Sequence, residues 1–389
     1  MKSVAVIGAS LAGLSAARAL RAQGFDGELT VVGGEARRPY DRPPLSKEFL
    51  AGDVGEDVLA LEAEDDDLDA QWLLGVHATR LDAAAGAVQL DNGTTVRTDG
   101  IVVATGARAR SWPASARLAG VHVLRTVDDA LALRHDLRPG ARLVVIGAGF
   151  IGGEVASTAA KLGLHVTVVE AALAPLAGPL GVQLGAAVAR LHTEHGTRLL
   201  CGAPVAGLLG TDRVTGVELA DGRRIAADVV VVGIGAVPNV EWLRDSAIEL
   251  ANGVVCDAGG ATSVPNVVAV GDCAAWHEPS VGWPHRVEHW TGAMERPAIA
   301  VATLLAGGRH DGIPAKPPYF WSDQYGRRIQ FAGIAHPGDE TTFEVGSLRD
   351  ASFLAVYRRG GEPVAVLGVD QPRLFTRWRR QLAVVPVPA

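Results

Sequence analysis

The sequence predicts an α/β protein built from two Rossmann-like folds and a small C-terminal α+β domain. A pattern of strand, glycine-rich turn, helix and strand occurs twice, first from Val4 and again from Arg142. After residue 314 the apolar runs become short and alternating, which is typical of an antiparallel sheet. The chain has 389 residues, enough for two or three domains of roughly 100 to 150 residues each.

Val4 to Ile7 is an apolar run rich in β-branched residues, and it predicts the first strand. A glycine-rich turn follows, and then Leu11 to Leu20, whose alanine and leucine content favours a helix. Leu29 to Val32 is the next apolar run. Such a βαβ unit spans about 30 residues, and its strands pair in parallel through a right-handed crossover.

The first glycine turn reads Gly8-Ala9-Ser10-Leu11-Ala12-Gly13, so Ser10 stands where the GxGxxG motif has its middle glycine. A small serine still lets a pyrophosphate approach the backbone, and it adds a hydroxyl donor. Glu35 follows the next predicted strand, where a carboxylate accepts hydrogen bonds from a ribose. We therefore expect a dinucleotide at this turn.

The second copy has the same order of elements. Arg142 to Ile146 predicts a strand, Gly147 to Gly152 a turn, Ile151 to Leu162 a helix and Val166 to Val169 a further strand. A complete GxGxxG in this context is a strong indication of a second dinucleotide site. The alternative, that one copy is a structural relic without a ligand, stays open at this point.

Each glycine of the second motif has a geometric reason. Gly147 allows the tight turn, Gly149 lets a pyrophosphate reach the backbone, and Gly152 lets the helix pack closely on the strand. Glu170, after the next strand, would bind the ribose and repel a 2′-phosphate, which favours NADH over NADPH. The alternative interpretation of Glu170 is a solvated strand end.

Composition excludes other classes of protein. The chain is 48% hydrophobic and 20% charged, as expected of a soluble globular protein. Its net charge of -7 argues against a general nucleic-acid binder. We expect no signal peptide, because a predicted strand begins directly after Ser3, and no membrane span, because no charge-free stretch approaches about 18 apolar residues. A cytoplasmic location follows as an expectation.

The three cysteines, Cys201, Cys256 and Cys273, stand alone without a CxxC pair. This spacing predicts neither a structural zinc site nor a redox disulfide between neighbouring cysteines. We expect reduced and mostly buried thiols, and no metal site.

Four further motifs lie in order along nearly the whole chain: Pro39-Tyr40-Asp41-Arg42-Pro43-Pro44-Leu45-Ser46-Lys47, Val103-Ala104-Thr105-Gly106, Ala269-Val270-Gly271-Asp272-Cys273 and Phe320-Trp321-Ser322-Asp323-Gln324-Tyr325. In these motifs the chain resembles the ferredoxin reductases of oxygenase systems. These are the putidaredoxin reductase and rubredoxin reductase group of the pyridine nucleotide-disulfide oxidoreductase superfamily, whose fold is glutathione reductase-like.

The resemblance implies that the first fold binds FAD and the second binds NADH. The implied domains are a discontinuous FAD-binding domain (1–108 and 238–315), an NAD-binding domain (109–237) and a C-terminal domain (316–389). Two further apolar strands are predicted, Ile101 to Ala104 before Thr105-Gly106 and Asp228 to Val232 before Gly233-Ile234-Gly235.

Residues that the glycine motifs and the resemblance assign to FAD are Gly8, Ser10, Leu11, Ala12, Gly13, Glu35, Arg42, Pro43, Lys47, Val76, Ala104, Thr105, Gly106, Arg125, Gly271, Asp272, Glu288, His289 and Trp290. Those assigned to NAD are Gly147, Gly149, Phe150, Ile151, Gly152, Glu154, Glu170 and Gly235. Within the first set, Asp272 is expected on the ribityl chain, Arg125 near the phosphates and Trp290 beside the isoalloxazine ring.

Four residues are expected at the reacting atoms. By resemblance, Lys47 lies near the flavin N5 and forms an ion pair with Glu154, which could instead be only a favourable acid at a helix N-terminus. Phe150 would cover the flavin until the nicotinamide displaces it, and Trp321 would lie near the exposed flavin edge. For both aromatic residues the alternative is ordinary packing.

The implied activity is that of a ferredoxin–NAD(+) reductase, in which FAD takes a hydride from NADH and passes single electrons to a [2Fe–2S] ferredoxin. That ferredoxin would serve a cytochrome P450 or a Rieske oxygenase. Arg296, Arg327 and Arg328 are candidates for steering it, or are ordinary surface residues. We expect a monomer or a weak dimer.

Two alternatives remain. An NADH oxidase, or a peroxide or disulfide reductase, shares both Rossmann-like folds but needs a cysteine near the flavin, and the region around Lys47 has none. A redox-regulated binding protein similar to apoptosis-inducing factor is the second alternative. The acidic net charge argues against it, and so does the expectation that the chain has no targeting segment.

Overall fold

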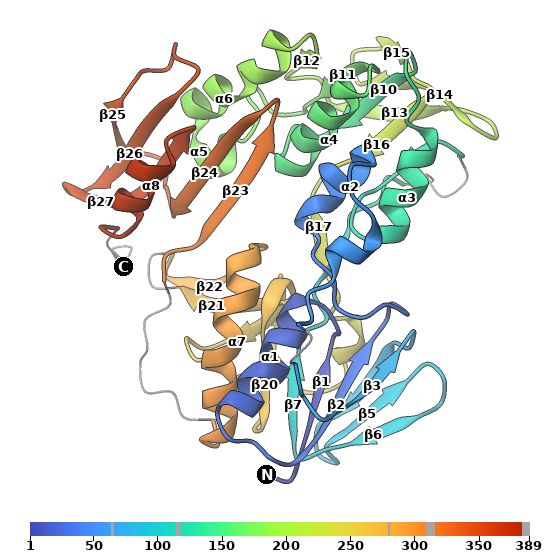
Figure 1. Cartoon of the computed structure of the whole chain (residues 1–389), viewed down its shortest axis with the longest axis vertical. Helices are drawn as coiled ribbons and strands as arrows, with labels where there is room; N and C mark the ends of the chain where they lie inside the picture. The colour runs from blue at the N-terminus through green and yellow to red at the C-terminus, as the bar shows by residue number, and fades with distance from the viewer. Residues whose placement is uncertain (64–65, 114–117, 279–280, 309–315, 383–389) are drawn as a thin grey trace.

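The computed structural model describes residues 1–63, 66–113, 118–278, 281–308 and 316–382. The first Rossmann-like fold forms the lower half of the molecule in Figure 1. The second fold and the C-terminal sheet lie above it, side by side. The site described below lies where these three parts meet.

The first fold has a five-stranded parallel sheet in the order β20-β7-β1-β2-β3. Its strands are β1 (Ser3–Ile7), β2 (Glu28–Gly33), β3 (Ala70–Leu74), β7 (Gly100–Val103) and β20 (Val267–Ala269). The helices α1 (Leu11–Ala22) and α7 (Trp290–Leu305) pack against each other. The strand β20 and the helix α7 of this fold come from late in the chain.

The second fold has the parallel order β12-β11-β10-β16-β9. Its strands are β9 (Val121–His122), β10 (Arg142–Ile146), β11 (His165–Val169), β12 (Arg198–Leu200) and β16 (Val229–Val232). Its helices are α3 (Val127–Asp136), α4 (Phe150–Lys161), α5 (Ala177–Leu180) and α6 (Val182–Glu194). The predicted βαβ units are therefore both present, with ends within two residues of the expected ones.

Three smaller sheets, two antiparallel and one mixed, extend the two folds. They consist of β4 (Ala78–Asp82), β5 (Ala87–Leu90) and β6 (Thr95–Arg97); of β13 (Val205–Gly210), β14 (Val214–Leu219) and β15 (Arg224–Ala226); and of the mixed set β18 (Leu250–Ala251), β19 (Gly253–Cys256), β21 (Ala274–Glu278) and β22 (Trp283–Arg286). The short helix α2 (Glu48–Ala51) follows a 3₁₀ turn at Pro43–Ser46. Further 3₁₀ turns lie at Glu56–Leu59, Glu241–Leu243 and Gly271–Cys273.

The chain crosses between the two folds through a two-stranded antiparallel ribbon. It is formed by β8 (Ala107–Ala109) and β17 (Ala236–Pro238), with Ala107 opposite Pro238. The two expected boundaries near residues 108 and 238 fall in this ribbon. The third expected boundary, between 315 and 316, borders on residues outside the described ranges.

The C-terminal part is an antiparallel sheet in the order β23-β24-β27-β26-β25, with one helix packed on it. These elements are β23 (Tyr319–Gln324), β24 (Arg327–Gly333), β25 (Glu340–Val345), β26 (Phe353–Arg359), β27 (Glu362–Val369) and α8 (Pro372–Arg379). The alternating runs predicted this sheet correctly.

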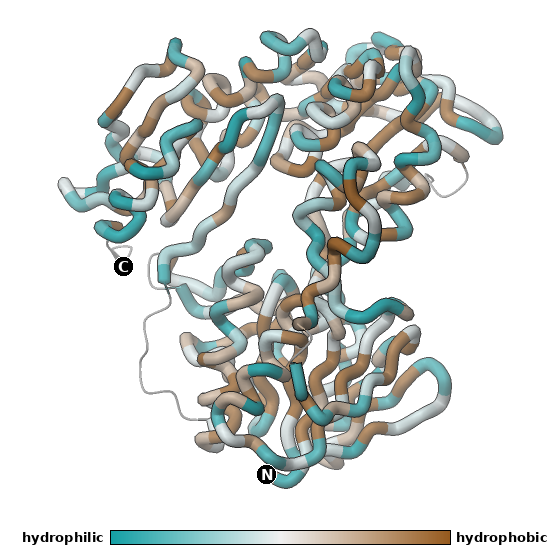
Figure 2. The backbone as a smooth tube through the Cα atoms, in the orientation of Figure 1, coloured by the Kyte–Doolittle hydropathy of each residue, from teal (hydrophilic) through white to brown (hydrophobic). Residues whose placement is uncertain are grey.

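The hydropathy of the backbone follows burial. Strands at the centre of both parallel sheets are apolar throughout, as Figure 2 shows for the lower sheet. All four residues of β7 and all four of β16 are buried, because helices and neighbouring sheets cover both faces. Within the described ranges, no helix has both the length and the hydropathy needed to span a membrane.

Candidate functional site

A cavity of about 1400 Å³ lies between the two folds and the C-terminal sheet. This volume exceeds the roughly 300 to 1000 Å³ usual for a site that holds one small ligand. Both glycine turns line it, the first with Gly8 and Ser10 and the second with Gly149 and Gly152. The structure therefore brings the two predicted dinucleotide sites into one continuous space.

The two glycine turns have matching geometry. Gly8 has φ +128° and Gly147 has φ +99°, in the region that favours glycine. A Cβ on Gly8 would lie 2.0 Å from the carbonyl oxygen of Ala104, and one on Gly147 would lie 2.2 Å from that of Gly233. By contrast, a Cβ on Gly149 would meet nothing within 4 Å, which leaves room for a ligand against the backbone.

Arg42 lies beside the first glycine turn and is held by several partners. Its Nη2 donates to Glu35 Oε1 at 2.7 Å, and its Nε donates to Ser10 Oγ at 3.4 Å. The Tyr40 hydroxyl donates to the other oxygen of Glu35 at 2.5 Å, and burial raises the pKa of that phenol. A guanidinium fixed at this turn is suited to a pyrophosphate.

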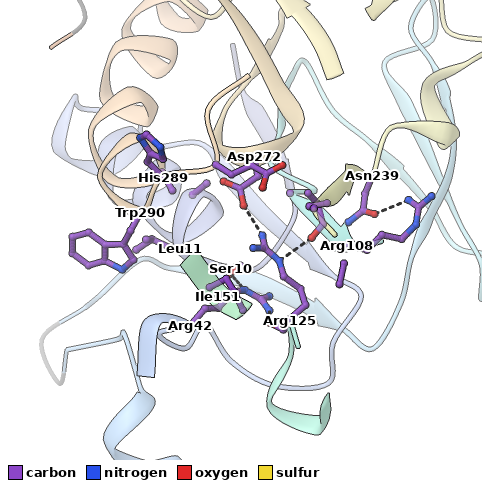
Figure 3. A pocket seen from close by; sticks show the side chains of 18 of the residues that line it. Ser10, Leu11, Arg42, Arg108, Arg125, Ile151, Asn239, Asp272, His289 and Trp290 are labelled. Carbon is purple, nitrogen blue, oxygen red and sulfur yellow. Dashed lines mark hydrogen bonds and ion pairs between the residues drawn. The ribbon is translucent and has the colours of Figure 1, made fainter. Parts of the chain in front are cut away.

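Asp272 and Arg125 face each other at the wall of the cavity, as Figure 3 shows. Arg125 Nη2 donates to Asp272 Oδ2 at 2.5 Å, and Arg125 Nε donates to the carbonyl oxygen of Ala107 at 2.9 Å. Burial lowers the pKa of Arg125, but the charge and hydrogen bond of Asp272, together with the charges of Glu288 and Tyr40, outweigh burial, and the pKa is raised. Asp272 is thereby fixed as a hydrogen-bond acceptor at the end of β20.

The expected ion pair between Lys47 and Glu154 is present. Lys47 Nζ lies 2.8 Å from Glu154 Oε2, although the two residues come from different folds. Lys47 also donates to the carbonyl oxygen of Pro43 at 2.8 Å. Both charged side chains line the cavity, and only 13% of the Lys47 side chain and 3% of Glu154 are exposed to solvent.

Aromatic side chains from all three parts meet at the cavity. The rings of Phe150 and Phe320 lie 4.3 Å apart, and those of His289 and Phe320 lie 4.9 Å apart. Trp290 contacts Trp321 edge to face at 5.7 Å. These rings form an apolar wall beside Lys47, suited to a planar ring system.

Two buried polar atoms at the cavity have no hydrogen-bond partner among the residues that the structure describes: His289 Nδ1 and Trp242 Nε1. Buried polar groups are nearly always paired, so a ligand is the natural source of these partners. Burial lowers the pKa of His289 to about 4, so the imidazole is neutral at pH 7. Together with the glycine turns, these atoms fit FAD and a nicotinamide dinucleotide.

Nearly all predicted site residues line the cavity, including Leu11, Ala12, Pro43, Val76, Ala104, Thr105, Gly106, Ile151, Gly235 and Glu288. Four do not: Gly13, Gly147, Gly271 and Glu170. The three glycines lie behind the cavity wall, where a Cβ would contact other residues. Glu170 instead accepts hydrogen bonds from the backbone N–H groups of Ala148 and Ala172, both at 2.8 Å.

Some residues at the site were not predicted. Asp41 accepts a hydrogen bond from Trp290 Nε1 at 2.7 Å, and burial raises the pKa of this carboxyl. Ser46 and Ser322 both donate to Glu154, and Trp242 presents its indole to the cavity. Asp41, Ser46 and Ser322 lie inside the motifs that carry the resemblance, so their place in these motifs could have identified them as site residues. No sequence feature identified Trp242.

The prediction that Arg296 helps to steer a partner protein is wrong. Only 12% of its side chain is exposed, because it lies over the Trp276 ring and 3.7 Å from Glu278. Arg327 and Arg328 lie nearer the surface, but each is paired with an aspartate, at 2.7 Å in both cases.

A basic surface that was not predicted lies instead on α8 and its end. Arg373, Arg377 and Arg380 are exposed there, and Arg379 lies over the Tyr319 ring at 4.2 Å. Tyr319 in turn stacks on Trp321. The signal was present in the sequence as four arginines between residues 373 and 380 without an acidic residue.

No cysteine lines the cavity in the part of the chain that the structure describes. All three cysteines are free, and Cys256 and Cys273 are buried in the core of the first fold. Burial raises the pKa of both thiols. A redox disulfide next to the flavin, which a disulfide reductase needs, is therefore not available from these residues.

Comparisons with known proteins agree with this geometry. Residues 2–296 match the family model of the pyridine nucleotide-disulphide oxidoreductases, and residues 319–385 match that of the reductase C-terminal domain. The ferredoxin reductase component of chlorobenzene dioxygenase from Cupriavidus sp. (strain PS12) is 41% identical over 96% of this chain and 90% of its own. Rhodocoxin reductase from Rhodococcus erythropolis is 38% identical over 98% of this chain and 89% of its own.

Among solved structures, the covalent putidaredoxin reductase–putidaredoxin complex superposes with a TM-score of 0.93 and 34% identity. That match covers 99% of this chain and 94% of the other. A NAD-dependent persulfide reductase from A. fulgidus shares the fold at 23% identity. The resemblance seen in the sequence motifs is thus confirmed, and the chain belongs to the pyridine nucleotide-disulphide oxidoreductase family.

Proposed function

We propose that the protein is an NADH-dependent ferredoxin reductase that passes electrons through FAD to a [2Fe–2S] ferredoxin serving an oxygenase. The observation that supports this proposal is the single cavity lined by both glycine turns and by Lys47. FAD and a pyridine nucleotide are the cofactors of the family. When bound, FAD takes up a hydride and releases electrons one at a time.

The two glycine turns, Arg42, Asp272 and Lys47 have distinct roles in this proposal. The first glycine turn and Arg42 hold the FAD pyrophosphate, and Asp272 accepts hydrogen bonds from the ribityl chain. Lys47 presents a positive charge that stabilises negative charge on the reduced cofactor. The second glycine turn holds the NADH pyrophosphate.

A protein partner would dock on the basic surface formed by Arg373, Arg377, Arg379 and Arg380. Opposite charges steer association, so this surface fits an acidic ferredoxin. Arg379 of this surface lies over the ring of Tyr319, and Tyr319 stacks on Trp321, which lines the cavity. The domain boundaries near residues 108, 237 and 315 remain part of the proposal, as does the monomeric or weakly dimeric state.

The test is NADH-dependent cytochrome c reduction by the FAD-loaded protein, with and without an added [2Fe–2S] ferredoxin, repeated with NADPH. We expect strong stimulation by the ferredoxin and a preference for NADH. Lys47→Met should lower the rate at least tenfold, whereas Lys161→Met, at an exposed lysine of α4, should not. Rapid NADH oxidation without any stimulation would contradict the proposal and favour an oxidase.

A further inference from the structure

The strand β23 lies along helix α4 and is the strand of the C-terminal sheet nearest that helix (Figure 1). Alternate side chains of the strand contact the helix. Phe320 contacts Phe150 at the start of α4, and two residues later Ser322 reaches Glu154. Gln324 comes next, over Gly153. Three side chains on one face of β23 thus contact α4, the helix that carries Glu154 of the Lys47–Glu154 pair.

Glu154, which belongs to the second fold, is enclosed by donors from the other two parts of the molecule. Its Oε2 accepts from Ser46 Oγ at 2.5 Å and from Lys47 Nζ at 2.8 Å. Its Oε1 accepts from Ser322 Oγ at 2.8 Å and from the backbone N–H of Asp323 at 3.3 Å. The carboxylate is buried, and four donors in fixed positions determine its orientation.

Gln324 determines the direction of the Ser322 hydroxyl. Gln324 Nε2 donates to Ser322 Oγ at 3.0 Å, and both side chains are buried. A hydroxyl has one hydrogen, and with Gln324 as a donor to its oxygen that hydrogen is free to point to Glu154 Oε1. A Cβ on Gly153 would lie 2.5 Å from Gln324 Oε1, so the glycine makes room for this amide.

The fixed carboxylate in turn fixes Lys47. An ammonium has three N–H donors, and two are used by Pro43 and Glu154. Lys47 lines the cavity, so the third donor is available to a bound ligand. Any turn of the Glu154 carboxylate would move the ammonium with it.

We infer that Ser322 is a positioning residue for hydride transfer. Through the Ser322 hydroxyl, the C-terminal sheet fixes the orientation of the Lys47–Glu154 pair. Ser46 performs the same task from the FAD-binding side. The C-terminal domain then contributes to the reaction of the flavin with NADH through Ser322, and it also carries the surface for the electron acceptor on α8. This inference rests on the proposed function, because it assigns a role within the reaction of the flavin with NADH.

The experiment compares Ser322→Ala with Ser347→Ala, which removes an exposed hydroxyl of the same domain. Both FAD-loaded variants and the wild type are mixed with NADH without oxygen and without ferredoxin, and the rate of flavin bleaching is recorded. We expect a fall of about tenfold for Ser322→Ala, the size expected for one lost hydrogen bond to a charged group. Ser347→Ala should match the wild type.

A second readout separates positioning from general stability. The midpoint potential of the bound flavin should become more negative in Ser322→Ala by about 30 mV, which corresponds to a tenfold change for a two-electron couple. Gln324→Met should shift the rate and the potential in the same direction by a smaller amount, because Ser322 keeps its hydroxyl but loses its orientation. This second variant tests the inference if Ser322→Ala does not fold.

The outcomes are distinguishable. If NADH does not reduce the flavin of the wild type, the proposed function fails. If it does, and both Ser322→Ala and Gln324→Met keep the wild-type rate and potential, the inference is overturned. A slower rate with an unchanged potential and a lower thermal stability would also overturn it, because that pattern indicates a merely structural serine.

Discussion

The rings of Phe150 and Phe320 lie tilted against each other with centroids 4.3 Å apart, one from the start of α4 and the other from β23. Such pairs contribute roughly 0.5 to 1.5 kcal/mol beyond their buried area. If Phe150 has to move when the nicotinamide binds, Phe320→Leu should tighten NAD⁺ binding by about two- to tenfold. Titration monitored by flavin absorbance measures this, with Phe343→Leu as the control on β25. An unchanged dissociation constant would show that the ring does not move.

Asp272 should be needed to retain FAD. Its carboxylate accepts from Arg125 and lines the cavity, so Asp272→Asn removes an acceptor for the cofactor and leaves Arg125 without its counter-charge. We expect the flavin-to-protein absorbance ratio after gel filtration to fall at least severalfold. Asp350→Asn, at an exposed loop position, is the matched control. Full retention of FAD by Asp272→Asn would argue against the assigned role.

Glu170 should discriminate between NADH and NADPH. It lies at the end of β11 and caps backbone N–H groups next to the second glycine turn. Glu170→Gln removes the negative charge but keeps an acceptor, so the ratio of kcat/KM for NADH over NADPH should fall about tenfold. Steady-state rates with both nucleotides measure this, and Glu218→Gln on β14 is the control. A constant ratio would mean that Glu170 is only structural.

His192 should make stability depend on pH. It is buried, lies 2.9 Å from the Tyr325 hydroxyl, and burial lowers its pKa to about 4 from the ordinary 6.5. Between pH 6.5 and 4 the unfolded chain therefore binds more protons than the folded one, so stability falls as the pH falls. His192→Gln should lose less stability than the wild type between pH 7 and pH 5, measured by urea unfolding. The exposed His165→Gln should behave as the wild type.

The arginines of α8 should govern docking of an acidic ferredoxin. The double variant Arg377→Gln and Arg380→Gln should raise the KM for ferredoxin about fivefold at low salt, with a smaller change at high salt. Reduction of ferricyanide by NADH, which needs no docking, should not change. The control is a double variant at Arg80 and Arg198, which are exposed on the two Rossmann-like folds. Equal effects of both double variants would exclude a local docking surface.

Sequence patterns predicted the two folds well because each βαβ unit is local and its glycines are required by backbone geometry. The pair of Lys47 and Glu154 came from the resemblance alone, since 107 residues separate them. The Ser322 contact spans 168 residues, and apart from its place in the motif from Phe320 to Tyr325 nothing in the local sequence distinguishes this serine from a surface one. Arg296 was misjudged for a related reason: its burial depends on Glu278 and Trp276 of another element.

The contact between β23 and α4 limits how freely evolution or an engineer can exchange parts of such a reductase. Grafting a foreign C-terminal domain to change the electron acceptor would also replace the residues that face Phe150, Gly153 and Glu154. A chimera that keeps Phe320, Ser322 and Gln324 should retain NADH oxidation. A chimera that changes them should transfer electrons poorly even to the acceptor that matches its grafted domain. Acceptor choice and the reaction with NADH would thus change together, because α8 and β23 belong to the same domain.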